Sequence, residues 1–322
     1  MVAQCSHPTI RRPHGARSRL SPGAARRPVG ELLAGRYRVV ELAGHGATGG
    51  VWRAEDELLT RDVAVKQLPH RPAERMTEAR IAARVRHPGV AAVHDLVEHR
   101  GTRWMVMDYY PGGTLAGLLQ RQRRLPPAVT AALGLQLVAA LGAVHAAGVV
   151  HCDVKPTNLL LGEDGRLVLV DFGIAEATGV GPVEPARDEG FVVGSPAYMA
   201  PELVRGEAAG PPADVWSLGA TLYSTVEGRP PFRRGDAAET LGAVLHDPPA
   251  TPRHAGRLAP LLARLLAKDP GVRPAHDAIR AALADVSETT PPAPGAEALT
   301  VAMAAGSGAD AEPTQQMYPN QR

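Results

Sequence analysis

The pattern of apolar and polar positions divides the chain into a strand-rich part and a helical part. Alternating stretches, "RYRVVELA" (36–43), "GGVWRAED" (49–56) and "DVAVKQL" (62–68), are joined by short turns and predict three strands. Residues 73–86 have helical spacing, and residues 90–97 and 103–109 predict further strands. After the break at "YPGG" (110–113), the pattern is mostly helical from Thr114 to about Asp285.

One apolar stretch within the helical part is long enough to imitate a membrane span. Residues 126–150 contain no formally charged side chain. They do contain Thr130, Gln136 and His145, and they continue directly into a polar cluster. We therefore expect a buried core helix rather than a span.

The polar cluster lies in "VVHCDVKPTNLLL" (149–161), between two apolar runs. The following "LLLGEDGRLVLVDFG" (159–173) predicts a β-hairpin around an Asp-Gly turn. In such a hairpin Asn158, before the first strand, lies beside Asp171, after the second. Their oxygens suit a hard cation such as Mg²⁺. A turn whose Asp and Asn side chains cap local backbone is the alternative, but it explains only part of the cluster.

These patterns predict an α+β fold with two lobes. We expect a basic disordered tail at 1–32, a body at 33–285 and an Ala/Pro/Gly-rich disordered tail at 286–322. Within the body we expect a β-rich N-lobe (33–107), a hinge (108–113) and a helical C-lobe (114–285).

Two further features carry chemistry. The segment "GHGATGGV" (44–51) is a glycine-rich turn between strands, where backbone N–H groups can approach phosphate oxygens; a plain glycine hairpin is the alternative. Glu78 shares an otherwise apolar helical face with Ile81, Ala82 and Val85, so it needs a partner. We expect that partner to be Lys66, with Glu74 as a rival to Glu78.

Lysine and asparagine are scarce: the chain contains only Lys66, Lys155 and Lys268, and only Asn158 and Asn320. In a composition rich in Arg, Ala, Gly and Pro, their persistence suggests specific roles. Lys66, Lys155 and Asn158 fall within the motifs above, whereas no chemistry is assigned to Lys268.

With these motifs in order, the chain resembles the eukaryotic-like (Hanks-type) bacterial serine/threonine protein kinases. The resemblance covers about residues 33–285 and adds "APE" (200–202), "DVWSLG" (214–219) and Arg273. It implies the two-lobed protein-kinase fold, ATP with Mg²⁺ (or Mn²⁺) as cofactors, and protein substrates with Ser or Thr acceptors.

The resemblance also assigns roles to individual residues. Asp153 would accept the proton of the substrate hydroxyl, Lys155 would steady the γ-phosphate, Lys66 held by Glu78 would grip the α/β-phosphates, and Asn158 and Asp171 would hold the metal. The nucleotide would be covered by the glycine-rich loop and lined by Ala64, Leu160, the gatekeeper Met107 and the hinge from Asp108 to Tyr110. The loop residues are Ala43, Gly44, His45, Gly46, Ala47, Thr48, Gly49, Gly50 and Val51. Glu202 and Arg273 would form a structural ion pair, and Asp214 would brace the catalytic loop.

The chain departs from the family's pattern directly before Asp153. Many members carry an Arg there, which holds a phosphate on the activation segment; here the residue is Cys152. Residues 174–194 offer only Thr178 as a hydroxyl, and Ser195 stands where the family usually has Thr. We therefore expect activity that is independent of phosphorylation in the middle of this loop. A space-filling Cys152 is favoured over a reactive thiol.

Two other functions stay open: a pseudokinase scaffold, and a small-molecule kinase of related fold. The intact polar set argues against the first, and "APE" with "DVWSLG" against the second.

The composition of the chain adds little to this interpretation. A net charge of +2 gives no signature for nucleic acid, and two cysteines fit a reducing compartment. Six arginines precede Glu31, but a solvated tail is favoured over a binding arm. We expect a cytoplasmic protein without a membrane span, with any regulatory partner acting through the tails.

Overall fold

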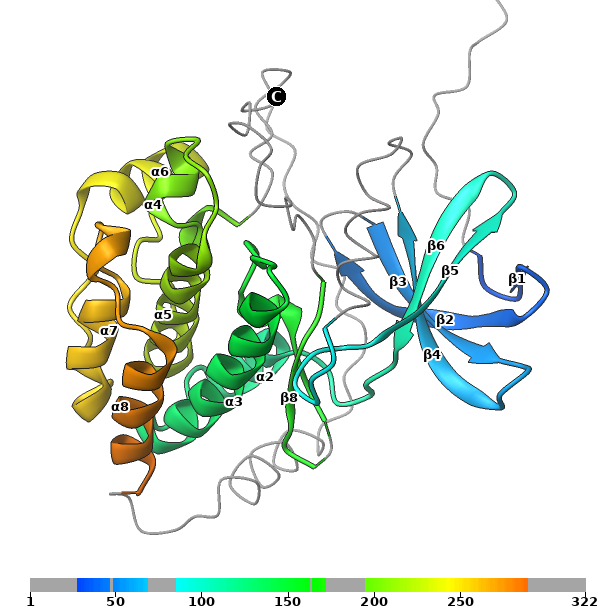
Figure 1. The fold of residues 1–322 in the computed structure, drawn as a ribbon, viewed down its shortest axis with the longest axis horizontal. Coiled ribbons are helices and arrows are strands. Elements are labelled where there is room, and N and C mark those ends of the chain that lie inside the picture. Colours follow the sequence, from blue (N-terminus) through cyan, green and yellow to red (C-terminus); the bar gives the residue numbers. More distant parts are fainter. Residues whose placement is uncertain (1–27, 47–48, 69–84, 163, 172–194, 289–322) are drawn as a thin grey trace, which may run out of the picture.

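The structure, a computed structural model, describes residues 28–46, 49–68, 85–162, 164–171 and 195–288. Figure 1 shows a β-sheet on one side, a group of helices on the other, and the hairpin containing β8 between them. This arrangement confirms the expected α+β fold with two lobes.

The N-lobe is built on an antiparallel sheet with the strand order β1-β2-β3-β4-β6-β5. Alternate side chains of these strands, including Tyr37, Val39, Val65 and Val106, are buried together in one small core. Within it, the rings of Trp52 and Trp104 meet edge to face, with their centroids 5.4 Å apart. The strands are β1 (Leu32–Leu33), β2 (Tyr37–Gly46), β3 (Gly49–Asp56), β4 (Arg61–Leu68), β5 (Val93–His99) and β6 (Thr102–Asp108).

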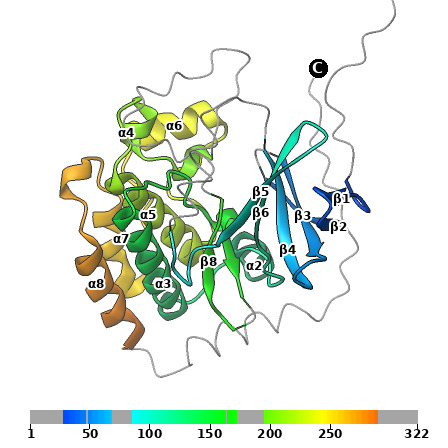
Figure 2. The same cartoon turned by 45° about the vertical axis from the view of Figure 1, so that its right-hand side comes forward.

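The C-lobe packs its helices around α3 and α5, which are its most buried elements. Figures 1 and 2 show α8 beside α3, with α7 close to α5. The longer helices are α2 (Leu115–Gln122), α3 (Pro127–Ala146), α5 (Pro211–Glu227), α6 (Ala237–His246), α7 (Ala259–Leu265) and α8 (His276–Glu288). The short ones are η1 (Pro156–Asn158), η2 (Pro196–Tyr198), α4 (Pro201–Val204), η3 (Gly256–Leu258) and η4 (Pro270–Val272).

Helix α3 contains most of the uncharged stretch noted in the sequence. Among the described residues it is the one helix long and apolar enough to cross a membrane. Its side chains Leu133, Leu137, Leu141 and Val144 are buried in the C-lobe core. This packing confirms the interpretation of the stretch as a core helix.

A short antiparallel hairpin of β7 (Leu159–Leu161) and β8 (Leu167–Leu169) follows the polar cluster, as predicted. It contacts the chain on both sides through isolated bridges, Val90 with Leu169 and Thr114 with Leu160. The hairpin therefore fixes the position of the residues that immediately precede and follow it.

The expected bounds of the body, 33–285, stay a prediction. Near the start, β1 pairs with β2, and the backbone N–H of Gly30 donates to Val39 at 2.8 Å. Near the end, α8 continues to Glu288, and Val286 is buried in the core. Residues just outside 33–285 therefore also take part in the packing. The predicted helix 73–86 lies almost wholly outside the described residues.

Candidate active site

The catalytic-loop segment, residues 151–158, gathers three functional side chains at one point. The Oδ2 atom of Asp153 accepts hydrogen bonds from Lys155 Nζ and from Asn158 Nδ2, each at 2.8 Å. Asn158 Nδ2 also donates to the carbonyl of Asp153 at 2.9 Å. All three side chains are largely shielded, so these charge-assisted contacts are strong and hold the Asp153 carboxylate in one place.

The hairpin brings Asp171 beside this group, as the sequence predicts. The backbone N–H of Val170 donates to the carbonyl of Asn158 at 2.9 Å. The residue that follows Val170, Asp171, is therefore held close to Asn158. His151 is fully buried beneath and hydrogen-bonds the backbone of Val170, and burial lowers the pKa of His151 so that it is neutral at pH 7. Asp171 has a φ of 62°, a left-handed conformation uncommon outside glycine.

Lys66 reaches this site from the other lobe. It lies on β4, it is 3% exposed, and its Nζ atom forms an ion pair with Asp171 Oδ1. The sequence did not predict this pairing, because it depends on the approach of two lobes across 105 residues. The expected partner Glu78 lies outside the described residues, so the Lys66–Glu78 pair stays a prediction.

The glycine-rich hairpin is paired with the strand that carries Lys66. Val51 pairs with Lys66 on β4 and with Gly44 on β2, so the hairpin of β2 and β3 starts directly beside the site lysine. Ala43 and His45 lie on β2, Gly46 pairs with Gly49 at the hairpin end, and the tip, Ala47 and Thr48, lies outside the described residues.

The packing around Gly50 leaves no room for a side chain. A Cβ atom there would lie 2.5 Å from the ring of Trp52, closer than a real side chain allows. The indole of Trp52 therefore packs directly against the glycine-rich hairpin.

Two of the residues expected around the adenine are neighbours in the N-lobe sheet. Ala64 on β4 pairs with Met107 on β6, and both are buried. Leu160 lies on β7 and is partly buried. These apolar side chains are suited to the faces of a flat ring.

The Asp108 side chain is held by hydrogen bonds to other groups of the protein. Its Oδ2 accepts from Ala92 N–H at 3.1 Å and Tyr110 Oη at 3.3 Å, and its Oδ1 lies 2.7 Å from His94 Nε2. Burial, followed by the charge of Asp108, raises the pKa of Tyr110 to about 12. The carboxylate of Asp108 is thus occupied by protein groups, and its backbone N–H donates to the carbonyl of Ala92 at 3.1 Å.

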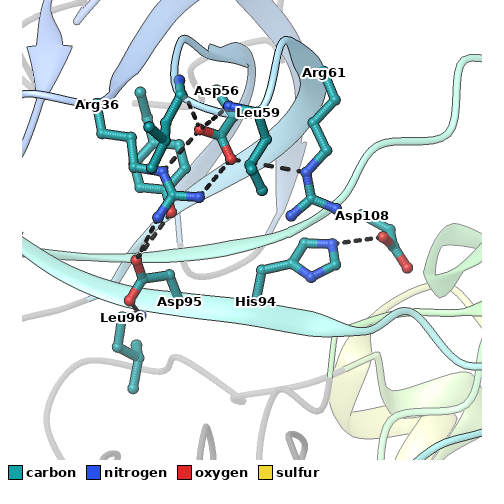
Figure 3. A network of polar contacts seen from close by, with 10 residues as sticks. Arg36, Asp56, Leu59, Arg61, His94, Asp95, Leu96 and Asp108 are labelled. Atoms are coloured by element: carbon teal, nitrogen blue, oxygen red, sulfur yellow. Dashed lines mark hydrogen bonds and ion pairs between the residues drawn. The ribbon is translucent and has the colours of Figure 1, made fainter.

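Figure 3 shows the contact of His94 with Asp108 and, beside it, a network of polar contacts around Asp56. The sequence did not reveal this network. The carboxylate of Asp56 is fully buried and accepts two hydrogen bonds from Arg36, each at 2.8 Å. Arg36 holds the pKa of Asp56 at about 2. Tyr37 donates to Asp95 at 2.9 Å, and burial raises the pKa of Tyr37 to about 12. The network joins β2, β3 and β5 and stiffens the N-lobe behind the hinge.

In the C-lobe, the segment that begins at Ser195 is fixed to α5 and to Arg273. Ser195 precedes η2, and the carbonyl of Tyr198 accepts a hydrogen bond from Ser217 of α5 at 2.8 Å. Glu202 forms the predicted ion pair with Arg273 at 2.6 and 2.8 Å. Asp214 braces the catalytic loop as predicted, because its carboxylate accepts the N–H groups of His151 and Cys152, each at 2.8 Å.

The donor set fits a nucleotide with a divalent cation. Among the described residues, no group of three or more His, Cys, Asp and Glu side chains could hold a metal alone. Asp171 and the amide oxygen of Asn158 would provide two hard ligands, which suits a cation that takes its remaining ligands from phosphates and water. Lys66 would provide positive charge for the phosphates.

Comparison with known proteins agrees with this geometry. Residues 37–283 match the protein kinase domain. Serine/threonine-protein kinase PknA of Mycobacterium tuberculosis is 38% identical over an alignment of 290 residues, which covers 82% of this chain and 66% of PknA once gaps are left out. Serine/threonine-protein kinase PknE of Mycobacterium bovis is 38% identical over an alignment of 248 residues, which covers 73% of this chain and 43% of PknE. The chain thus spans about two thirds of one relative and less than half of the other.

The order of motifs, the two-lobed fold and the match over most of the chain lead to one assignment: this chain belongs to the protein kinase family, among the eukaryotic-like bacterial serine/threonine kinases.

Proposed function

We propose that this protein is an ATP-dependent serine/threonine protein kinase that uses Mg²⁺ and has Asp153 as its base. The observation that carries the proposal is the convergence of Lys155 and Asn158 on the Asp153 carboxylate, next to Asp171 and Lys66. ATP supplies the phosphoryl group, and the cation neutralises charge on its oxygens.

The residues of the chain contribute mainly positioning and charge. Asp153 orients a Ser or Thr hydroxyl and accepts its proton. Lys155, 2.8 Å from the same carboxylate, offsets negative charge at that point. Asn158 and Asp171 hold the cation, and Lys66 holds the phosphates.

Protein rather than small-molecule acceptors are supported by the segment 195–202. It is held on α5 through Ser217 and anchored by the buried Glu202–Arg273 pair. The same helix holds the catalytic loop through Asp214, so α5 supports both. A small metabolite would not need such a segment.

The test is phosphate transfer from labelled ATP with Mg²⁺, with a protein lysate as the acceptor. Asp153→Asn should lower the rate about 10²–10⁴-fold, because the substrate proton loses its acceptor. Asp236→Asn is the matched control: Asp236 caps α6 on the exposed surface, and Asn caps equally well, so its rate should equal the wild type's. Binding of ATP without any transfer would instead identify a pseudokinase, and transfer only to small molecules would identify a metabolite kinase.

We also propose that activity does not need a phosphate in the middle of the activation segment. Cys152 is half-buried, a cysteine side chain has no cationic form, and its N–H is already held by Asp214. At this position the chain therefore offers no cation to bind a phosphate.

Phosphatase treatment followed by a kinase assay tests this second proposal. The treated protein and the Thr178→Val variant should keep their rate within about twofold, and Cys152→Ser should do the same if Cys152 fills space. Stoichiometric phosphate at Thr178 or Ser195, with activity lost on its removal, would refute the proposal.

A further inference from the structure

Two histidines from separate helices meet behind the catalytic loop. His145 lies in the last turn of α3, and His276 is the first residue of α8. Their atoms Nδ1 and Nε2 are 3.1 Å apart, and their rings are tilted by 36° with centroids 5.0 Å apart. The contact depends on the packing of α8 against α3, which both views of the fold show.

His145 is joined in turn to Asp214 in the first turn of α5. Its Nε2 atom lies 2.7 Å from Asp214 Oδ2. The same oxygen accepts the N–H of His151, and Asp214 Oδ1 accepts the N–H of Cys152. Asp214 is fully buried, so its carboxylate has no water to replace a lost partner.

These contacts form a continuous connection from the start of α8 to the base. Cys152 directly precedes Asp153 and has a φ of 61°, an unfavourable conformation that persists only when its surroundings enforce it. The Asp214 carboxylate provides that enforcement. A shift of Asp214 would therefore move the backbone that carries Asp153.

The hydrogen atoms in this connection can be counted. An ionised Asp214 only accepts, so His145 Nε2 carries a proton and donates it. Between His145 Nδ1 and His276 Nε2, one nitrogen must donate and the other accept. The contact is therefore intact when the pair is neutral or holds one positive charge. A second added proton would place two N–H groups face to face and break it.

The charged groups around the pair come from α5 and α8. Asp214 faces it from α5, and Asp277 and Arg280 lie beside His276 on α8. Burial, followed by His145 and Arg280, lowers the pKa of His276, while the two acids act in the opposite direction. His276 is partly exposed, so protons from solution reach the pair.

We propose that His276 is a positioning residue for Asp153, acting through His145 and Asp214 on the backbone of the catalytic loop, and that this connection is lost when both histidines are protonated. The effect on catalysis rests on the proposed kinase function. The effect on the loop does not.

The experiment compares three variants of the full chain. His276→Gln keeps an amide that can donate to His145 Nδ1 but does not titrate, and His276→Phe keeps an aromatic ring without the hydrogen bond. His254→Gln is the matched control, because His254 is an exposed C-lobe histidine outside this connection.

Two readouts are needed. Hydrogen exchange of the amides of His151 and Cys152 at pH 7.5 reports on the loop directly. The pH dependence of kcat and of KM for ATP between pH 5.5 and 8.5 reports on catalysis.

We expect His276→Phe to speed exchange of the two amides at least tenfold and to lower kcat three- to tenfold, with KM for ATP within twofold. His276→Gln should match the wild type in both readouts at pH 7.5. Below pH 6 it should keep a higher fraction of its kcat than the wild type does.

The outcomes separate this proposal from the proposed function. The proposal is overturned if both His276 variants have the same amide exchange and the same pH profiles as His254→Gln. It is also overturned if the kcat of the wild type declines at acidic pH and His276→Gln shows the same decline. If the phenylalanine variant does not fold, the glutamine variant alone still decides through its pH profile. If exchange responds as expected but the wild type transfers no phosphate, the positioning role stands and the kinase function fails.

Discussion

At the scale of single residues, Arg273 makes several buried polar contacts in the C-lobe. It donates to both oxygens of Glu202, to the carbonyl of Pro212 at 2.7 Å and to that of Ala267 at 2.9 Å. The side chains of Arg273 and Glu202 are only 1% and 6% exposed. Neither charge can be hydrated if its partner is removed, so each depends on the other.

Replacing Arg273 should therefore be costly. Arg273→Met leaves Glu202 as an unpaired buried charge and should lower the free energy of unfolding by about 3–5 kcal/mol. Arg234→Met is the control, because its ion pair with Asp247 is exposed, and it should cost less than about 1 kcal/mol. Urea denaturation at pH 7 measures both, and similar losses in the two variants would contradict the assignment.

Lys268 shows what scarcity in a sequence can and cannot indicate. Scarcity pointed correctly to Lys66, Lys155 and Asn158 as members of one group. Lys268, equally scarce, donates to the carbonyl of Ala243 and lies 4.0 Å from the ring centroid of Phe232, and burial lowers its pKa to about 8. Its role is in packing, and no sequence motif marks it because its partners come from α6 and from the turn that precedes α6.

At the scale of elements, close approach of the C-lobe helices depends on particular glycines. A Cβ atom on Gly219 of α5 would lie 2.7 Å from the Cβ atom of Leu265 on α7. Gly142 of α3, by contrast, has no atom within 4 Å of such a position. One glycine allows two helices to pack, while the other only weakens its own helix.

The same substitution at these two sites should have opposite effects. Gly219→Ala should destabilise the protein by about 1–3 kcal/mol, because α7 must move away from α5. Gly142→Ala should stabilise it by about 0.5–1 kcal/mol, because alanine loses less backbone entropy on folding. Denaturation midpoints of the two variants give the comparison, and a gain in stability for Gly219→Ala would refute the packing argument.

Local elements were the part of the fold that the sequence could predict. Alternation and turn residues located β2, β3, β4 and the hairpin of β7 and β8, and the hairpin alone placed Asn158 near Asp171. Contacts between distant elements, such as His145 with His276 across 131 residues, could not be predicted. A helical pattern identifies the apolar face of a helix, but it does not identify the element that packs against that face.

Burial of polar groups was equally hidden from the sequence. Asp56 ends an alternating strand and looks like an exposed acid, yet it is fully buried against Arg36. The helix expected at 73–86 and its Glu78 stay predictions.

At the scale of the whole molecule, the pair of Lys66 and Asp171 links the two lobes. A ligand that occupies the space between them contacts groups from both, so its binding should stabilise the folded chain as a unit. By mass action the gain is about 2.7 kcal/mol at a ligand concentration of 100 times Kd.

Thermal unfolding with nucleotide measures this coupling. ATP with Mg²⁺ should raise Tm more than ATP with a chelator, because Asn158 and Asp171 contribute only through the cation. Asp171→Asn should remove most of the metal-dependent part. Asp164→Asn, an exposed acid in the turn of the same hairpin, should leave it unchanged. An equal loss in both variants would argue against a metal site at Asp171.

The packing of Trp52 against Gly50 has a practical consequence. Trp52 and its neighbour Trp104 are the indoles of the N-lobe, and the remaining tryptophan, Trp216, is stacked on Phe232 in the C-lobe. In a Trp216→Phe variant, all tryptophan fluorescence would come from the N-lobe sheet that carries the glycine-rich hairpin. Such a protein would report the loading of its own nucleotide optically, without an attached dye.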